Sequence, residues 1–287
     1  MENLSIFNTG VRLAEKVLGR IGVYVCPLCL KSFDANDLSE GLLSLEHVPP
    51  KSTGGKGIIL TCKKCNNSSG YLFEGDFKKK NKLISAIEAV FQLSNDSPHR
   101  FKMNLSGIET DVKLQVDDGR VNIEVLRNTN DPKQISQQLS QLKIMSDGDF
   151  RGLSFNLTTS QRFKERNIEL SFLKSAFLAC VAKFGYSFCK SNSTDEVRKQ
   201  IIYPEKDYFE GFLFRKTSEI DGENKIIYFQ KRNVLLCIID NYVVVLPIPD
   251  ETLDDYNAFV EEYREINNAT LNGIDHGWPS SFEGIYD

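Results

Sequence analysis

The order of apolar and polar residues predicts six helices. We place five of them at residues 8–20, 82–93, 133–143, 170–188 and 253–266, and a sixth that opens at Asn66. The stretch 170–188 is the most apolar segment of the chain, with about five turns rich in phenylalanine, leucine and valine. A helix that is apolar on all sides is buried on all sides, so we expect this one to be the central helix of a folded domain.

Short runs of alternating or β-branched residues predict the strands. They fall at residues 21–25, 58–61, 110–116, 120–126, 153–157, 209–214, 225–230, 234–239 and 242–246. The pair 110–116 and 120–126 flanks Asp117-Asp118-Gly119, which is typical of a hairpin turn. Residues 94–98 are typical of a linker. The pattern therefore indicates an α+β protein with a first domain at 1–95 and a larger one at 100–287.

Composition and charge narrow the class of protein. Hydrophobic residues make up 41% of the chain and charged residues 26%, and we find neither a membrane-spanning run nor a signal peptide, so we expect a cytoplasmic protein without a membrane partner. The net charge of −4 argues against a uniformly basic nucleic-acid-binding protein. Residues 1–100 nevertheless carry 13 Lys and Arg against 10 Asp and Glu, whereas the remainder carries 22 against 29. Contact with phosphate is therefore expected in the first third.

Four of the seven cysteines form two CxxC pairs, Cys26/Cys29 and Cys62/Cys65. Random placement of seven cysteines would give only roughly 0.15 such pairs. Each pair can bind one face of a tetrahedral Zn²⁺, and two pairs complete a closed four-thiolate site. A redox role for one pair is the alternative, but neither pair lies in a βαβ pattern. The sequence therefore predicts a structural zinc.

The loop between the two pairs carries a second candidate, the dipeptide Glu46-His47 followed by Pro49-Pro50-Lys51-Ser52 and Gly54-Gly55. An imidazole can take a proton from water while a carboxylate holds a cation, which is the chemistry of metal-assisted phosphodiester hydrolysis. A single histidine is also common as a solvated surface residue.

The order of these pieces resembles that of HNH endonucleases, in which two strands and a helix enclose one divalent cation. The resemblance covers residues 26–70 and includes Asn66, which follows the second cysteine pair. It implies a small zinc-stabilised ββα-metal (HNH) module, followed here by a larger mixed α/β domain with the buried central helix. It also implies DNA as the substrate, with RNA as the less favoured alternative, in the setting of bacterial defence, mobile elements or repair.

The resemblance assigns roles to three residues. His47 falls on the general-base position, Glu46 on a metal-ligand position and Asn66 on the helix-borne metal ligand. Oxygen ligands suit Mg²⁺ or Mn²⁺ better than zinc, so the catalytic ion would be distinct from the structural one. Glu74 lies eight residues after Asn66 and is a candidate for an additional ligand or supporting role.

One position departs from the family pattern. Gly57 stands where the family has an asparagine that orients the histidine, and a glycine has no side chain for that task. Either a backbone carbonyl or Asn67 orients His47, or the module is a zinc-stabilised nucleic-acid-binding unit with an inactive site. The three intact residues favour the enzyme.

The remaining candidates are weaker. Four lysines flank the motif, namely Lys51, Lys56, Lys63 and Lys64. They are expected either to contact phosphates or simply to be solvated, and the same holds for the lysine run at residues 78–82. In the second domain we expect buried free thiols at Cys180, Cys189 and Cys237, an exposed His99, and a packing turn at Asp275-His276-Gly277-Trp278. No activity can be assigned to that domain.

Overall fold

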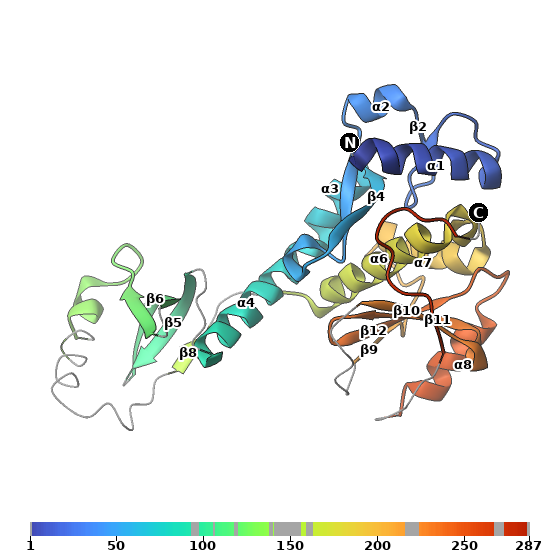
Figure 1. Cartoon of the computed structure of the whole chain (residues 1–287). Helices are drawn as coiled ribbons and strands as arrows, with labels where there is room; N and C mark the ends of the chain where they lie inside the picture. Colours follow the sequence, from blue (N-terminus) through green and yellow to red (C-terminus); the bar gives the residue numbers. More distant parts are fainter. Residues whose placement is uncertain are drawn as a thin grey trace. The chain divides into compact units, whose positions relative to one another are not determined.

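The structure is a computed structural model of the 287-residue chain (Figure 1). It describes residues 2–92, 98–105, 107–117, 120–137, 140, 156–158, 163–215, 224–266 and 273–285. These residues mix helix and strand, as the sequence predicts, and divide into two compact units, Met1–Phe77 with Lys164–Asp287, and Lys78–Phe163. The chain leaves the first unit after Phe77 and returns to it at Lys164, whereas we expected one division between residues 95 and 100.

The N-terminal part of the first unit contains both cysteine pairs. Helix α1 packs on β1, β1 pairs antiparallel with β2, and β3 pairs antiparallel with β4, which runs directly into α3. A π-helical turn, η2, continues the path of α3. The elements are α1 (Glu2–Leu18), β1 (Tyr24–Val25), β2 (Ser32–Phe33), α2 (Ala35–Ser39), β3 (Leu43–Val48), η1 (Lys51–Thr53), β4 (Lys56–Cys62), α3 (Lys63–Ser69) and η2 (Gly70–Glu74).

Tyr24 fixes α1 and the hairpin to each other. Its ring lies against Gly10 of α1, where a Cβ atom would stand 2.3 Å from the ring, so only glycine fits. Its hydroxyl donates to the Leu60 carbonyl at 2.7 Å and accepts from the Leu60 amide. Burial raises the pKa of Tyr24 well above its ordinary value, so the phenol stays protonated and keeps both hydrogen bonds.

The C-terminal part of the first unit is built around a five-stranded antiparallel sheet in the order β13-β10-β11-β12-β9. Every residue of β11 is buried, because α6 and α7 cover one face of the sheet and α8 lies on the other (Figure 1). The elements are α6 (Glu165–Phe184), η3 (Tyr186–Cys189), α7 (Asn192–Ile202), β9 (Leu213–Arg215), β10 (Lys225–Phe229), η4 (Gln230–Arg232), β11 (Val234–Ile239), β12 (Tyr242–Pro247), α8 (Asp254–Tyr263) and β13 (Ile274–Asp275).

Helix α6 corresponds to the apolar stretch predicted at 170–188, and it contacts the sheet as well as β3, β4 and η2. The segment that follows it reaches the first cysteine pair. The Tyr186 hydroxyl donates to the Val25 carbonyl at 2.6 Å, and the Arg198 guanidinium donates to the Leu28 carbonyl at 2.9 Å. Residues 26–70 are therefore packed into the same unit as the helix that we had placed in a separate domain.

The second unit is a four-stranded sheet in the order β7-β6-β5-β8, with Phe101, Met103, Val112 and Leu114 in its core and Leu83 packed against them. The hairpin predicted at 110–126 is confirmed, with Asp117 opposite Arg120. The elements are α4 (Gly75–Gln92), which begins in the first unit, β5 (His99–Leu105), β6 (Ile108–Asp117), β7 (Arg120–Val125) and β8 (Asn156–Thr158).

Several boundaries differ from those predicted. Residues 209–212 are not strand, and at the start of this segment the Gln200 side chain, rather than a neighbouring strand, accepts a hydrogen bond from the Phe209 amide. Of the helix predicted at 133–143, residues 133–137 and 140 are helical, and the rest lies outside the described residues, as do residues 153–155 of a predicted strand. Within the described part of the chain, no helix is long and apolar enough to cross a membrane.

Candidate functional site

The four cysteines of the two CxxC pairs meet in space. Cys26 and Cys29 lie in the tight turn between β1 and β2, where Leu30 has a φ of 57° and its amide donates back to the Cys26 carbonyl. Cys62 ends β4 and caps α3, which carries Cys65. The four sulfur atoms lie within 4.8 Å of one another.

This arrangement fits a metal ion such as zinc. A tetrahedral ion with Zn–S bonds of about 2.3 Å places its sulfur ligands about 3.8 Å apart, and the Sγ atoms of Cys29 and Cys62 are 3.7 Å apart. Four thiolates leave no coordination position for a substrate, so the ion would have a structural role.

The thiols share hydrogen bonds with one another. In the hydrogen bond between Cys26 and Cys29, the Cys26 thiol donates and the Cys29 sulfur accepts, which raises the pKa of Cys26 and lowers the pKa of Cys29. A bond from Cys26 likewise lowers the pKa of Cys62 to about 7. Metal binding would replace these shared protons, which makes it pH-dependent.

Strands β3 and β4 and helix α3 form a ββα arrangement directly beside the cysteine cluster. Asn66 of α3 donates from Nδ2 to the Ser44 hydroxyl at 2.9 Å. Ser44 and Glu46 lie two residues apart in β3 and so share one face of the hairpin. The structure thus brings Asn66 and Glu46 to the same face.

The Glu46 carboxylate is buried and both of its oxygens have partners. Oε2 accepts from the Thr61 hydroxyl at 2.9 Å, and Oε1 accepts from the Lys174 ammonium of α6 at 2.8 Å. The same ammonium donates to Glu74 of η2 at 2.6 Å. Glu46 therefore belongs to a buried ion cluster with Lys174 and Glu74.

His47 lies at a half-buried position next to Glu46 but leaves β3 on the opposite face, because successive side chains of a strand alternate. The pairing passes from Glu46 opposite Ile59 to His47 opposite Gly57, so Ile58 forms a bulge in β4. Among the described residues, none forms a hydrogen bond with the His47 side chain. The structure therefore does not bring the side chains of Glu46 and His47 together.

The other predicted positions are exposed or structurally constrained. Asn67 and the four lysines Lys51, Lys56, Lys63 and Lys64 are exposed. Gly57 is buried, and a Cβ atom there would stand 2.4 Å from a methyl group of Leu45. An asparagine at this position, as in the family pattern, would require the Leu45 side chain to move.

Sequence reasoning missed Lys174 and the proximity of Trp278. Lys174 is the only charged residue between Glu169 and Lys183 in an apolar helix, and such a lysine must find carboxylates. The Trp278 indole donates to the Val48 carbonyl at 3.3 Å, one residue beyond His47. Cys180, Cys189 and Cys237 are buried free thiols, as predicted.

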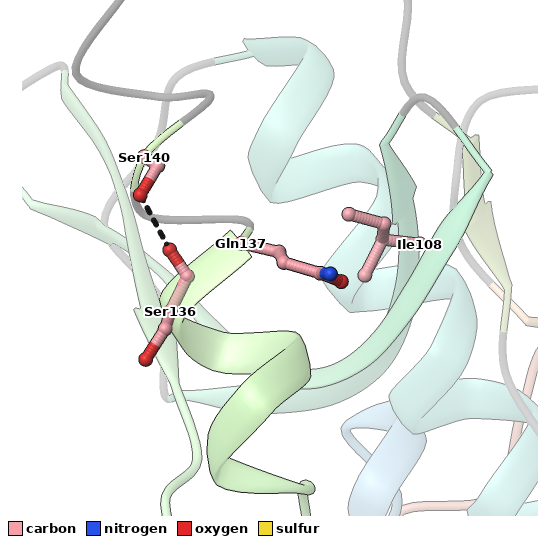
Figure 2. A pocket seen from close by; sticks show the side chains of 4 residues that line it. All are labelled: Ile108, Ser136, Gln137 and Ser140. Carbon is pink, nitrogen blue, oxygen red and sulfur yellow. Dashed lines mark hydrogen bonds between the residues drawn. The ribbon is translucent and has the colours of Figure 1, made fainter.

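The second unit has a hollow lined by Ile108, Ser136, Gln137 and Ser140 (Figure 2). The Ser140 hydroxyl donates to the Ser136 carbonyl at 2.8 Å. These four residues include neither a general base nor a general acid, so none of them could activate the two serine hydroxyls.

No protein-family model, curated protein or solved structure matches this chain.

We expect the purified protein to contain about one zinc ion per chain by elemental analysis. Cys29→Ser and Cys62→Ser should lose the ion and lower the melting temperature, because the module around the cluster depends on the metal for part of its stability. Cys237→Ser, which removes a buried thiol outside the cluster, is the matched control and should keep the zinc. A folded wild-type protein free of zinc would contradict the assignment.

We expect Gly57→Ala to destabilise the protein by about 1–3 kcal/mol, the usual effect of overpacking. The same substitution should cost less in a Leu45→Ala background, because the methyl group that clashes is absent there. The measurement is the midpoint of denaturant unfolding of both variants, with Leu45→Ala alone as the control. A Gly57→Ala variant as stable as the wild type would show that Leu45 moves aside at no cost.

Proposed function

We propose that the ββα arrangement of β3, β4 and α3 is the active site of a metal-dependent endonuclease of the HNH class that hydrolyses phosphodiester bonds in DNA. The observation that carries the proposal is the contact of Asn66 with Ser44, which brings the helix-borne ligand candidate to the face of β3 that bears Glu46. The cysteine cluster at the start of α3 supports it, because a structural ion there would fix the helix against the hairpin.

In this proposal each residue has a separate task. His47 takes a proton from the attacking water, and it is free for that task because none of the described residues holds its side chain by a hydrogen bond. Glu46 and Asn66 offer oxygen atoms of the kind that hold Mg²⁺ or Mn²⁺, which would polarise the phosphate. Since both Glu46 oxygens have partners, one of them must exchange its partner for the ion.

Charge and exposure support a nucleic acid as the substrate. Lys51, Lys56, Lys63 and Lys64 are exposed on the segments that surround Glu46-His47, and exposed lysines can contact phosphates without reading bases. DNA is the proposed substrate. The hydrolytic chemistry does not distinguish the two sugars, so cleavage of RNA but not of DNA would make RNA the substrate.

A second candidate is a zinc-stabilised nucleic-acid-binding module that does not cut. Three observations favour it. The Lys174 ammonium is hydrogen-bonded to the Glu46 carboxylate, and the side chains of Glu46 and His47 lie on opposite faces of β3. Position 57 has no side chain to orient the histidine, and one placed there would displace Leu45. Binding needs only the exposed lysines and the folded module.

We expect the protein to relax and linearise supercoiled plasmid DNA in the presence of Mg²⁺ or Mn²⁺. Brief treatment with EDTA should abolish cleavage reversibly while the zinc stays bound, because oxygen ligands hold a hydrated cation more loosely than thiolates hold zinc. Restoration by added Zn²⁺ alone would contradict a Mg²⁺- or Mn²⁺-dependent site. DNA binding without cleavage in any metal would support the second candidate.

We expect His47→Ala to lower the cleavage rate by about 10²–10⁴-fold, the usual contribution of a general base, with zinc content and DNA affinity unchanged. Raising the metal concentration should not rescue it, whereas Asn66→Ala should be partly rescued because it weakens the ion. His99→Ala, which removes a histidine of the second unit, is the control and should cut at the wild-type rate. Equal rates for His47→Ala and wild type would exclude His47 as the base.

A further inference from the structure

The proposed reaction leaves the buried ammonium of Lys174 without a role. Its side chain is 3% exposed, and the side chains of Glu46 and Glu74 are 9% and 11% exposed. The three groups come from α6, β3 and η2, so they are brought together only by the fold of the first unit. The hydroxyl of Thr61 completes the set.

The charges of this cluster do not balance. Two carboxylates around one ammonium leave a net charge of −1 in a buried place, which is costly unless further groups compensate. The Lys174 ammonium lies 2.8 Å from the Glu46 carboxylate and 2.6 Å from the Glu74 carboxylate, so it is the one cation that these two described carboxylates share.

The position of Glu74 depends on an unusual backbone. Gly70–Glu74 forms a π-helical turn between α3 and α4. Such turns are rare and occur frequently at functional sites. Here the turn places the Glu74 carboxylate 2.6 Å from the ammonium that also contacts Glu46.

We propose that Lys174 controls the access of a divalent cation to Glu46, because its ammonium occupies the cation position between Glu46 and Glu74. This inference rests on the proposed function, in which Glu46 is a metal ligand. The ion binds Glu46 only when the ammonium leaves that carboxylate, and Lys174 thereby sets the metal concentration that the site requires. The ammonium that leaves Glu46 keeps Glu74 as its partner, at 2.6 Å.

The test compares Mn²⁺ binding by zinc-loaded, full-length variants. Free Mn²⁺ gives a paramagnetic resonance signal that is lost on binding, and titration gives the affinity. The variants are wild type, Lys174→Met, and Lys174→Met with Glu46→Gln. Lys183→Met is the matched control, because Lys183 also lies on α6 and forms an ion pair with Glu283 at 2.7 Å.

We expect Lys174→Met to bind Mn²⁺ at least about tenfold more tightly than the wild type, since a unit charge a few ångströms away in a buried place acts strongly on the ion. Adding Glu46→Gln should abolish the gain, and Lys183→Met should bind as the wild type does. The melting temperature of Lys174→Met should also rise with Mn²⁺ concentration, by the linkage of binding to stability.

Equal or weaker Mn²⁺ binding by Lys174→Met would overturn the inference and leave Lys174 as a purely structural residue. If Lys174→Met folds only in the presence of Mn²⁺, the ion replaces the ammonium and the inference stands. If it fails to fold at any Mn²⁺ concentration while Lys174→Met with Glu46→Gln and Glu74→Gln folds, the ion cannot replace the ammonium and the inference fails. A tighter site in Lys174→Met together with a wild type that never cuts DNA would refute the nuclease and keep the inference.

Discussion

An ammonium group buried in a protein interior is tolerated only when carboxylates surround it, and at Lys174 this requirement joins the two halves of the first unit. Helix α6 comes from a part of the chain more than a hundred residues beyond β3, yet its lysine has partners in β3 and η2. Removing both glutamates would leave the buried ammonium without a carboxylate partner, so the two ion pairs together hold the helix against the hairpin and η2. The cysteine cluster, the hairpin and α6 therefore form one unit.

This dependence explains why the sequence predicts the cysteine cluster but not the extent of the unit that contains it. Local signals were sufficient for the CxxC pairs, whose spacing brings two sulfurs to one ion, and for the hairpin of β6 and β7, whose turn residues are adjacent. The domain division needed long-range contacts, such as Tyr186 with Val25, that no local pattern encodes. The return of the chain to the first unit at Lys164 has no signature in composition or linker sequence.

The same distinction applies within the candidate site. The order of Glu46, His47 and Asn66 along the chain predicts that they share a site, and the structure places Asn66 and Glu46 on one face because α3 packs on β3. Order along the chain did not reveal that Glu46 is held by Lys174, nor that the bulge at Ile58 leaves His47 opposite Gly57. Both facts depend on tertiary packing. A lone lysine in the apolar helix was the only sequence signal of the ion cluster.

The two proposed candidates differ in one physical respect, which is whether the Glu46 carboxylate can exchange its partner. As a component of a closed ion cluster, Glu46 stabilises the packing of α6 on the hairpin and leaves the exposed lysines to bind nucleic acid. As a metal ligand, it must release the ammonium, and the released charge has Glu74 as its remaining partner at 2.6 Å. Because Lys174 already contacts both carboxylates, it can keep one ion pair while the other oxygen turns to the metal. Glu46 can therefore serve as a metal ligand without leaving the buried ammonium unpaired, because Glu74 remains the partner of that ammonium.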